Sequence, residues 1–309
     1  MKRIIVTESQ FKKLVENINS GKTLIVYHKV DWDGFTSAAI ALKAFPQADL
    51  YPWNYNDAIL PDTSNYDKVI LVDLTIAPNG DYSWMEENAH KLIWIDHHDN
   101  AMNGFANSKN IDGIRRNGIG ACVLTWEKFF PNKPLPLHVA LCGTYDVVKK
   151  DGEFADWEDA WLYQLSLDLI QFNPQVKVEK ALEFIDEPQK VTIERIKSGE
   201  PLEAKRAAEE VERFKHAVYS EINGIKICKI VDSGRGLALI KTNSDNHTAD
   251  IFAIRNPRPL KDNPNLYSVS FRVPENSNVD ASEIARHYGG NGHVKAAGCK
   301  MTLKQFENF

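Results

Sequence analysis

Acidic and histidine side chains follow three short apolar segments in the N-terminal half of the sequence. The first segment ends in His28, and Asp31 and Asp33 come directly after it. The second ends in Asp73, and the third ends in the run Asp96-His97-His98. Apolar segments of this length, separated by helical patterns, predict the strands of a parallel sheet. Because the carboxyl ends of parallel strands meet at one edge, we expect these side chains to lie close together.

Such a cluster of four carboxylates and three imidazoles is costly to bury unless cations neutralise it. Oxygen and imidazole ligands suit Mn²⁺, with Mg²⁺, Co²⁺ and Zn²⁺ as alternatives. The ligands are too many for one ion but suit two ions about 3.5–4 Å apart, which lower the pKa of a water molecule and align it with a phosphorus atom. A single aspartate at a strand end is more often a turn residue or helix cap. The three sets at the same structural position instead predict a two-metal hydrolytic centre.

The elements that position these residues alternate between strands and helices, which predicts an α/β domain with a parallel sheet. A Thr-x-x-Gln capping box at Thr7 begins the series. The predicted elements are a helix at 7–19, a strand at 22–28, a helix at 35–45, a strand at 68–74, a helix at 82–90, a strand at 91–95, and helices at 118–130, 137–145 and 157–169.

The composition changes after residue 186 to Glu, Lys, Arg and Ala. This change predicts a long exposed helix, which Pro201 is expected to break or restart. A smaller α+β domain is expected beyond it. Its predicted elements are strands at 225–231, 237–241 and 267–273, a surface loop at 256–264 and a helix at 281–288. We therefore expect a catalytic domain at 1–186, a helical linker at 187–220 and a second domain at 221–309.

The chain has 309 residues, of which 43% are hydrophobic and 26% charged, as in soluble globular proteins. Its apolar runs are too short to cross a bilayer and no signal peptide is recognisable, so we expect a cytoplasmic protein without a membrane partner. The formal net charge of −5 disfavours tracking of long nucleic acid. A small anionic substrate stays open, because metal ions supply positive charge locally. Four scattered cysteines predict buried free thiols.

The run Asp96-His97-His98, in order after the other two sets, resembles the motif of the DHH phosphoesterase superfamily. This superfamily includes RecJ-type exonucleases, nanoRNases, cyclic-dinucleotide phosphodiesterases and family II pyrophosphatases. The segment 289–293, Gly-Gly-Asn-Gly-His, followed by Ala-Ala-Gly at 296–298, is similar to the glycine-rich substrate loop of the DHH-associated domain. Ser270-Phe271-Arg272 resembles the serine-x-arginine strand of that domain. The resemblance thus covers most of the chain.

The resemblance implies two metal sites. His28 and Asp31 are expected to bind the first ion, Asp33 and His97 the second, and Asp73 both.

Further roles are implied around these sites. Asp96 is expected to orient a histidine, and His98 to face the substrate phosphate. Asp146 is the expected last metal ligand, with Asp151 as the alternative. Glycines let a backbone approach a phosphate closely, and arginine pairs with phosphate through two hydrogen bonds. The residues expected to bind substrate are Arg116, Arg272, Gly289, Gly290, Gly292 and His293.

A two-domain chain of this kind resembles nanoRNases, which implies hydrolysis of short oligonucleotides and, in some members, of adenosine 3′,5′-bisphosphate. Three alternatives stay open: a single-strand exonuclease acting on longer DNA or RNA, a phosphodiesterase of cyclic or linear dinucleotides, and a degenerate protein that only binds nucleotides. The glycine-rich loop disfavours a pyrophosphatase. The oligomeric state is left open, a homodimer being one alternative because some relatives are dimers.

Overall fold

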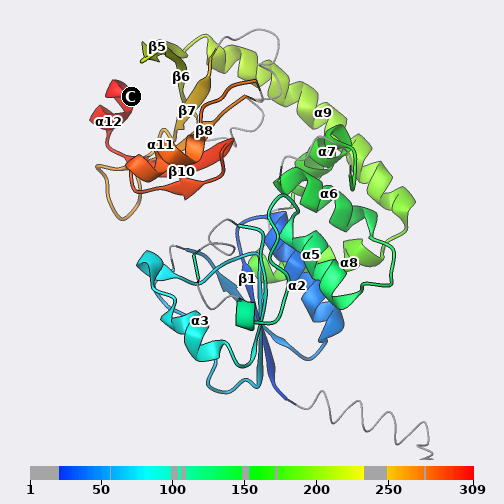
Figure 1. Cartoon of the computed structure of the whole chain (residues 1–309). Helices are drawn as coiled ribbons and strands as arrows, with labels where there is room; N and C mark the ends of the chain where they lie inside the picture. Colours follow the sequence, from blue (N-terminus) through cyan, green and yellow to red (C-terminus); the bar gives the residue numbers. More distant parts are fainter. Residues whose placement is uncertain are drawn as a thin grey trace, which may run out of the picture. The chain divides into compact units, whose positions relative to one another are not determined.

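The computed structural model describes residues 21–55, 57–98, 104–105, 109–147, 153–170, 173–232, 249–274 and 276–309. They divide into an N-terminal unit, Met1–Glu200, and a C-terminal unit, Pro201–Phe309 (Figure 1). The predicted helix at 7–19 and the predicted strand at 237–241 lie outside the described residues. The domain limits expected from the sequence stay a prediction.

The N-terminal unit contains a parallel sheet with the strand order β2-β1-β3-β4. Its strands are β1 (Thr23–His28), β2 (Asp49–Trp53), β3 (Lys68–Val72) and β4 (Leu92–Ile95). The predicted strands match β1, β3 and β4 closely, and the expected parallel α/β fold is confirmed. β2 has no predicted counterpart, because its Asp-Leu-Tyr-Pro-Trp sequence includes a proline, which is tolerated in an edge strand only.

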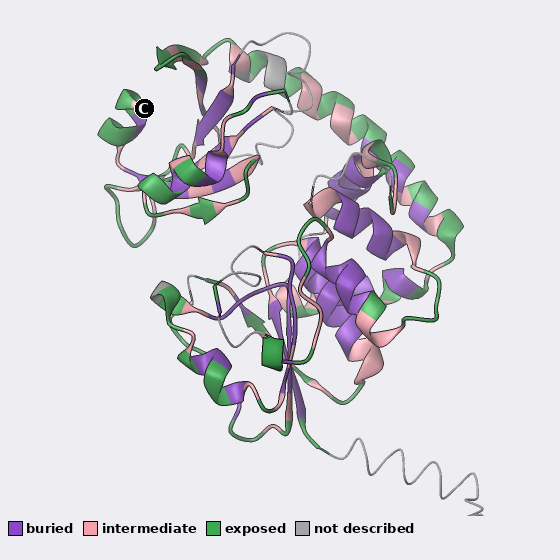
Figure 2. Ribbon diagram, viewed as in Figure 1, coloured by how far each residue is buried: buried purple, intermediate pink, exposed green. Residues whose placement is uncertain are grey.

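Two layers of side chains cover this sheet, because successive strand residues point to opposite faces. Ile25 and Tyr27 pack into a large core with the helices of one face, whereas Leu24 and Val26 pack on the other face with Met85 of α3. Figure 2 shows the central strands and the inner helices as buried. The helical elements of this unit are α2 (Trp32–Ala44), η1 (Pro78–Gly80), α3 (Ser83–Asn88), α5 (Ala121–Phe129), α6 (Leu137–Asp146), α7 (Trp157–Leu167) and α8 (Pro174–Asp186).

Two of these helices differ from the prediction. α2 begins at Trp32, three residues before the predicted start at 35, because the Asp31 side chain caps it by accepting a hydrogen bond from the Gly34 amide at 3.0 Å. α8 was not predicted, although its sequence has a start signal: Asn173 caps the helix, and Pro174 occupies its first turn.

α9 (Gln189–Phe214) runs across the limit between the two units and contains Pro201 in its interior. The expected break at Pro201 was wrong. A proline inside a helix removes one backbone hydrogen bond, a loss that packing elsewhere can offset. Such packing exists two residues earlier, where Gly199 lies so close to Leu162 of α7 that a Cβ would be 2.1 Å from the Leu162 carbonyl oxygen.

The C-terminal unit is a mixed sheet with the order β5-β6-β7-β8-β10-β9, covered on one face by α11. The predicted strands at 225–231 and 267–273, the loop at 256–264 and the helix at 281–288 are confirmed. The remaining strands and the last helix were not predicted. The elements are β5 (Val218–Ile222), β6 (Ile225–Val231), β7 (Ile251–Arg255), β8 (Tyr267–Arg272), α11 (Ala281–His287), β9 (Asn291–Gly292), β10 (Ala296–Met301) and α12 (Leu303–Asn308).

The four cysteines are buried free thiols, as predicted. Among the helices of the described segments, none combines the length and the apolar character needed to cross a membrane.

His138 forms a buried polar contact at the centre of the helical layer. Its Nε2 atom lies 3.0 Å from the Thr36 hydroxyl in α2, and its Nδ1 atom lies 2.8 Å from the Tyr163 hydroxyl in α7. The ring also packs edge-on against Phe184 of α8. Burial, with a smaller contribution from Arg195, lowers the pKa of His138 to about 3. The folded protein therefore keeps this ring neutral.

We expect this neutral ring to make the fold sensitive to acid. An unfolded histidine has a pKa of about 6.5, so between pH ~6.5 and ~3 the unfolded chain binds one proton more at this position. The free energy of unfolding then falls by about 1.4 kcal/mol for each pH unit of acidification. His138→Gln cannot titrate and should flatten this dependence, although it lowers stability at neutral pH.

Urea unfolding of both proteins at about pH 7, 6 and 5 measures the difference. His90→Gln, at an exposed histidine, is the matched control. Parallel pH profiles for the wild type and His138→Gln would contradict the prediction.

Candidate metal centre

The candidate ligands gather at the carboxyl ends of β1, β3 and β4. The chain leaves β1 toward β2 and leaves the neighbouring β3 toward β4, so these two connections run to opposite edges of the sheet. Ligands of open parallel sheets bind at such a switch point. His28 ends β1, Asp73 follows β3, and Asp96 follows β4.

A first triad joins the loop after β1 to the end of β3. His28 Nδ1 lies 3.3 Å from Asp31 Oδ2 and 3.3 Å from Asp73 Oδ2. The ligand atoms of the three residues lie within 4.8 Å of one another. One cation can therefore contact all three.

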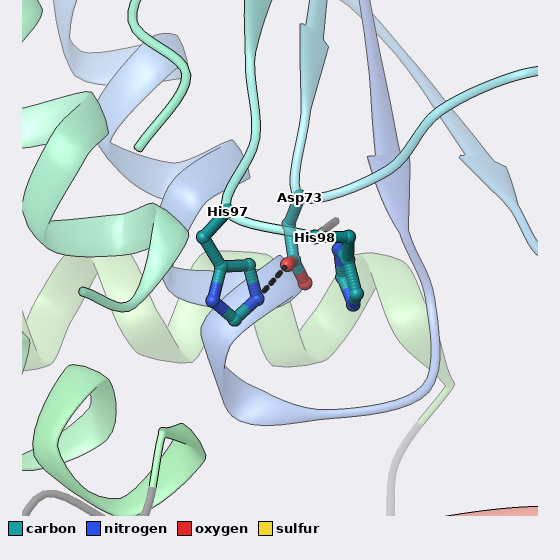
Figure 3. Close-up of side chains that lie close together, drawn as sticks. All are labelled: Asp73, His97 and His98. Atoms are coloured by element: carbon teal, nitrogen blue, oxygen red, sulfur yellow. Dashed lines mark ion pairs between the residues drawn. The ribbon is translucent and has the colours of Figure 1, made fainter. Parts of the chain in front are cut away.

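A second triad comprises Asp33, His97 and Asp146, whose ligand atoms also lie within 4.8 Å of one another. His97 Nε2 lies 3.8 Å from Asp33 Oδ2 and 3.3 Å from Asp146 Oδ2. The same nitrogen lies 3.3 Å from Asp73 Oδ1, as Figure 3 shows. Asp73 thus directs Oδ2 toward His28 in the first triad and Oδ1 toward His97 in the second triad.

The backbone of Asp73 is unusual, because its φ angle is +60°. A residue other than glycine in this left-handed region costs on the order of 1 kcal/mol. Aspartate and asparagine adopt this backbone conformation more readily than other residues with a Cβ. The Asp73 amide donates a hydrogen bond to the Ile95 carbonyl oxygen at 2.9 Å, which fixes the turn after β3.

His98 is oriented by a buried carboxylate. Its Nδ1 atom lies 2.7 Å from Asp96 Oδ1, and the Thr75 hydroxyl donates to Asp96 Oδ2 at 2.7 Å. The amides of His97 and His98 donate to Asp96 Oδ1 as well. Although burial opposes ionisation, these contacts and the imidazole of His98 lower the pKa of Asp96 to about 2. Asp96 is therefore a fixed negative charge that orients the His98 ring through its Nδ1 atom.

Asp33 is held by the first turn of α5. The amides of Ala121 and Cys122 donate to its two carboxylate oxygens at 2.7 and 2.8 Å, and a helix N-terminus favours a negative charge. Two glycines allow this approach: a Cβ on Gly120 would lie 2.5 Å from the Cα of Gly143 and 3.2 Å from Asp33 Oδ1. The contact between these glycines brings α5 and α6 together at Asp33.

The carboxylates of the cluster repel one another. Burial, followed by the charges of Asp73 and Asp146, raises the pKa of Asp33 well above its ordinary value. Burial also raises the pKa of Asp146 to about 6, against a smaller opposing effect of His97. Without added positive charge, the cluster therefore holds protons that isolated carboxylates would release.

The excess of carboxylates also changes the pKa values of two histidines. Burial alone would lower the pKa of His28 and of His97, yet the surrounding carboxylates raise both well above the ordinary value. The protons that these rings take up provide the positive charge that divalent cations supply in a loaded site.

The donor atoms fit a metal centre by a second criterion. Two buried atoms, His28 Nδ1 and Asp73 Oδ1, have ion-pair partners at 3.3 Å but no partner with hydrogen-bond geometry among the described residues. A buried polar atom without a partner is costly, and a bound ion is one of the explanations for it. Oxygen donors with one imidazole in each triad suit Mn²⁺ or Mg²⁺ better than a thiolate-seeking metal.

Most of the residues singled out in the N-terminal half are thus brought together. Asp151 lies outside the described residues. Arg116 lies at the surface, where its guanidinium forms an ion pair with Glu127 at 2.6 Å.

The glycine-rich segment lies in the C-terminal unit, after α11. Gly289, with a φ of +73°, ends α11, and the Gly290 amide donates back to Ala285 at 2.8 Å, a common way to terminate a helix. A turn at His293 joins β9 to β10. Arg272 ends β8 on the same sheet. A structural explanation therefore exists for Gly289 and Gly290 beside the implied substrate contact.

Thr75, Gly120 and Gly143 were not among the predicted site residues. Gly143 could have been noticed in the sequence, because a glycine inside a predicted helix lowers helix stability by about 1 kcal/mol and often indicates close packing. Thr75 could not have been noticed in this way, since its contact with Asp96 depends on the pairing of β3 with β4.

Comparisons with known proteins agree with this geometry. Residues 22–132 match the model of the DHH family, N-terminal domain. No curated protein matches the chain.

Several solved structures are similar along most of the chain. The DHH domain of a member of the s1p family of ribosomal proteins is 14% identical, with a TM-score of 0.61 and coverage of 93% of this chain and 85% of that one. An exopolyphosphatase-related protein from Bacteroides fragilis is 10% identical, with a TM-score of 0.53 and coverage of 99% and 96%. Exonuclease RecJ bound to manganese is 12% identical, with a TM-score of 0.50 and coverage of 100% and 94%. At these identities the likeness shows the fold.

Asp73→Asn tests the shared ligand. Asparagine keeps the side-chain shape and tolerates the positive φ of +60°, but it removes the charge that both triads share. We expect Mn²⁺ binding to fall from two ions per chain to one or none, while the midpoint of thermal unfolding without metal stays within a few degrees. Metal analysis and calorimetric titration measure both. Asp49→Asn, at an exposed position, is the control, and two ions bound to Asp73→Asn would contradict the assignment.

Gly120→Ala tests the contact that holds Asp33. The new Cβ would force apart Gly120 and Gly143 and press on the Asp33 carboxylate. Loss of a group that orients a metal ligand commonly lowers metal affinity about 10- to 100-fold, and we expect a loss of this size for Mn²⁺. Gly298→Ala, where the nearest atom would lie at an ordinary 3.4 Å, is the control. Unchanged Mn²⁺ affinity in Gly120→Ala would show that the contact is not needed.

Proposed function

We propose that the chain, whose residues 22–132 match the DHH family, N-terminal domain, is a phosphoesterase of the DHH superfamily that hydrolyses short oligonucleotides or small nucleotides with two divalent metal ions. Linear or cyclic dinucleotides and adenosine 3′,5′-bisphosphate fall within this substrate class. Mn²⁺ is the proposed ion, with Mg²⁺, Co²⁺ and Zn²⁺ as alternatives.

One observation carries the proposal: Asp73 directs its two carboxylate oxygens to histidines of different triads, each at 3.3 Å. A carboxylate shared in this way is the usual bridge of a two-metal site. His28 and Asp31 would complete the first site, and Asp33, His97 and Asp146 would complete the second.

Two ions held by these residues would lower the pKa of a water molecule and neutralise the phosphoryl oxygens. The chain adds a further group on the same edge of the sheet. Burial would lower the pKa of His98, but the Asp96 carboxylate at 2.7 Å raises it. His98 therefore keeps its proton to higher pH, and in this role it donates a hydrogen bond to a phosphate oxygen or to the departing oxygen.

The preference for small substrates is supported by charge. The net charge of −5 gives no general attraction for a long polyanion, whereas two dications create a local one. Among the similar structures, the exonuclease bound to manganese acts on nucleic acid, as its name says. We extend its metal and its general substrate class to this chain.

The C-terminal unit is proposed to bind the substrate. Arg272 would pair with a phosphate of the substrate, and the glycine-rich segment with His293 would approach its backbone. Arg116 of the N-terminal unit is proposed to meet a second phosphate, which requires it to leave Glu127.

A hydrolysis panel with purified protein and Mn²⁺ tests the proposal. The substrates are RNAs of about two to five nucleotides, adenosine 3′,5′-bisphosphate, a linear and a cyclic dinucleotide, and a long single-stranded DNA. We expect fast turnover of the shortest substrates, abolished by a chelator and lowered at least about 1,000-fold in Asp73→Asn, since removal of metal-centred catalysis costs several kcal/mol.

Two other outcomes of this panel would assign a different function to the chain. Preference for the long DNA would make it a single-strand exonuclease. Absence of turnover on every substrate, with nucleotide binding retained, would make it a nucleotide-binding protein and contradict the proposed activity.

A further inference from the structure

Tyr55 lies beside the metal centre and is partly exposed to solvent. Its ring centroid is 5.8 Å from that of His28 and 6.5 Å from that of His98. The interplanar angles of 64° and 78° are steep, so neither imidazole covers the ring in a parallel stack. The residue stays 44% exposed. A flat aromatic surface thus stands next to one residue of the first triad and next to the histidine expected to face phosphate.

The hydroxyl end of the Tyr55 ring is in contact with Thr75. The Thr75 amide donates a hydrogen bond to the Tyr55 hydroxyl at 3.4 Å. Thr75 is the same residue whose hydroxyl binds Asp96 behind His98. The position of the Tyr55 ring is therefore coupled to the network that orients His98.

The loop that carries Tyr55 is tied to the loop of the metal ligands. Asp57 accepts hydrogen bonds from Lys29 Nζ at 2.6 Å and from the Asn54 amide at 3.0 Å. The Lys29 amide donates to the Trp53 carbonyl oxygen at 3.2 Å. Lys29 is thus bound to Trp53 and to Asp57, on either side of Tyr55 in the chain.

Both tied segments and their continuation carry further exposed apolar side chains. Val30 is 50% exposed, Ile59 74% and Leu60 37%. Exposing such side chains to water is unfavourable. A site that binds only phosphate gains nothing from them. An aromatic ring with apolar neighbours is instead the surface on which nucleobases stack. Exposed apolar side chains near a polar centre commonly belong to a ligand site.

We propose that Tyr55 is the platform on which the nucleobase next to the hydrolysed phosphate stacks, with Val30 as an apolar neighbour, so that the site selects nucleoside esters over esters and polyphosphates without a base. The inference rests on the proposed function for the placement of the phosphate at the metal centre. It goes further by assigning the base a binding surface in the N-terminal unit.

Binding of two ligands that differ only in the base tests this directly. Adenosine 5′-monophosphate and ribose 5-phosphate are titrated into the full chain with Mn²⁺ present, and the two dissociation constants are compared. Stacking of one base on an aromatic side chain gives about tenfold in affinity or more. We therefore expect the wild type to bind the nucleotide at least about tenfold more tightly than the sugar phosphate.

Three variants locate the effect. Tyr55→Ala should bring the two dissociation constants to within about twofold of each other, whereas Tyr55→Phe keeps the ring and should keep the preference. Tyr219→Ala removes a tyrosine of similar exposure, 51%, from the C-terminal unit and should change nothing. Each variant should still bind two Mn²⁺ ions, because Tyr55 is not a ligand.

The results that overturn the inference are separate from those that overturn the proposed activity. A wild type that binds both ligands equally, or binds neither, removes the stacking platform, and so does a preference that persists in Tyr55→Ala. Loss of Mn²⁺ from Tyr55→Ala would show that the ring only supports His28. Since binding needs no turnover, a catalytically silent protein leaves this test valid.

Discussion

Repulsion between buried carboxylates around Asp73 is the constraint on which the rest of the N-terminal unit depends. Asp33 and Asp146 are pushed to higher pKa values, and the two nearest histidines are drawn toward protonation. Such a cluster lowers its free energy when cations enter, and it stays costly otherwise. The surrounding structure must therefore keep the ligands from moving apart, since separation would relieve the repulsion and destroy the site.

The supports that do this are mostly backbone groups and small residues. Two amides at the start of α5 hold Asp33, and the Gly120–Gly143 contact lets that helix reach it. Asp73 sits in a left-handed turn whose amide is bound to Ile95. Backbone amides suit this purpose, because they do not titrate and their positions follow from the pairing of whole elements. The cost of the crowded charges is thus balanced by the rigidity of the sheet and of the helical layer.

This division explains how much the sequence could predict. A side chain at the end of a buried strand has a known place, so Asp73 and the run Asp96-His97-His98 could be predicted to share an edge from strand patterns alone. The fold of the unit followed from the same patterns. Support by Gly120 and Gly143 could not be predicted in this way, because it depends on how closely α5 and α6 pack once the chain has folded. Pro201 inside α9 and Pro52 inside β2 show the same limit, since tertiary packing overrides the local preference of proline.

Strand position also separates the two tasks of the proposed enzyme. The inner strands β1 and β3 carry His28 and Asp73, and burial on both faces holds these two ligands rigidly. β2 lies at the edge and leads into the loop of Tyr55, which is tied down by Lys29 and Asp57 but stays open to solvent. Changes in an edge loop disturb a core less than changes in a central strand. A chain built in this way can change which base it accepts, through Tyr55 and its apolar neighbours, while the arrangement around Asp73 stays the same.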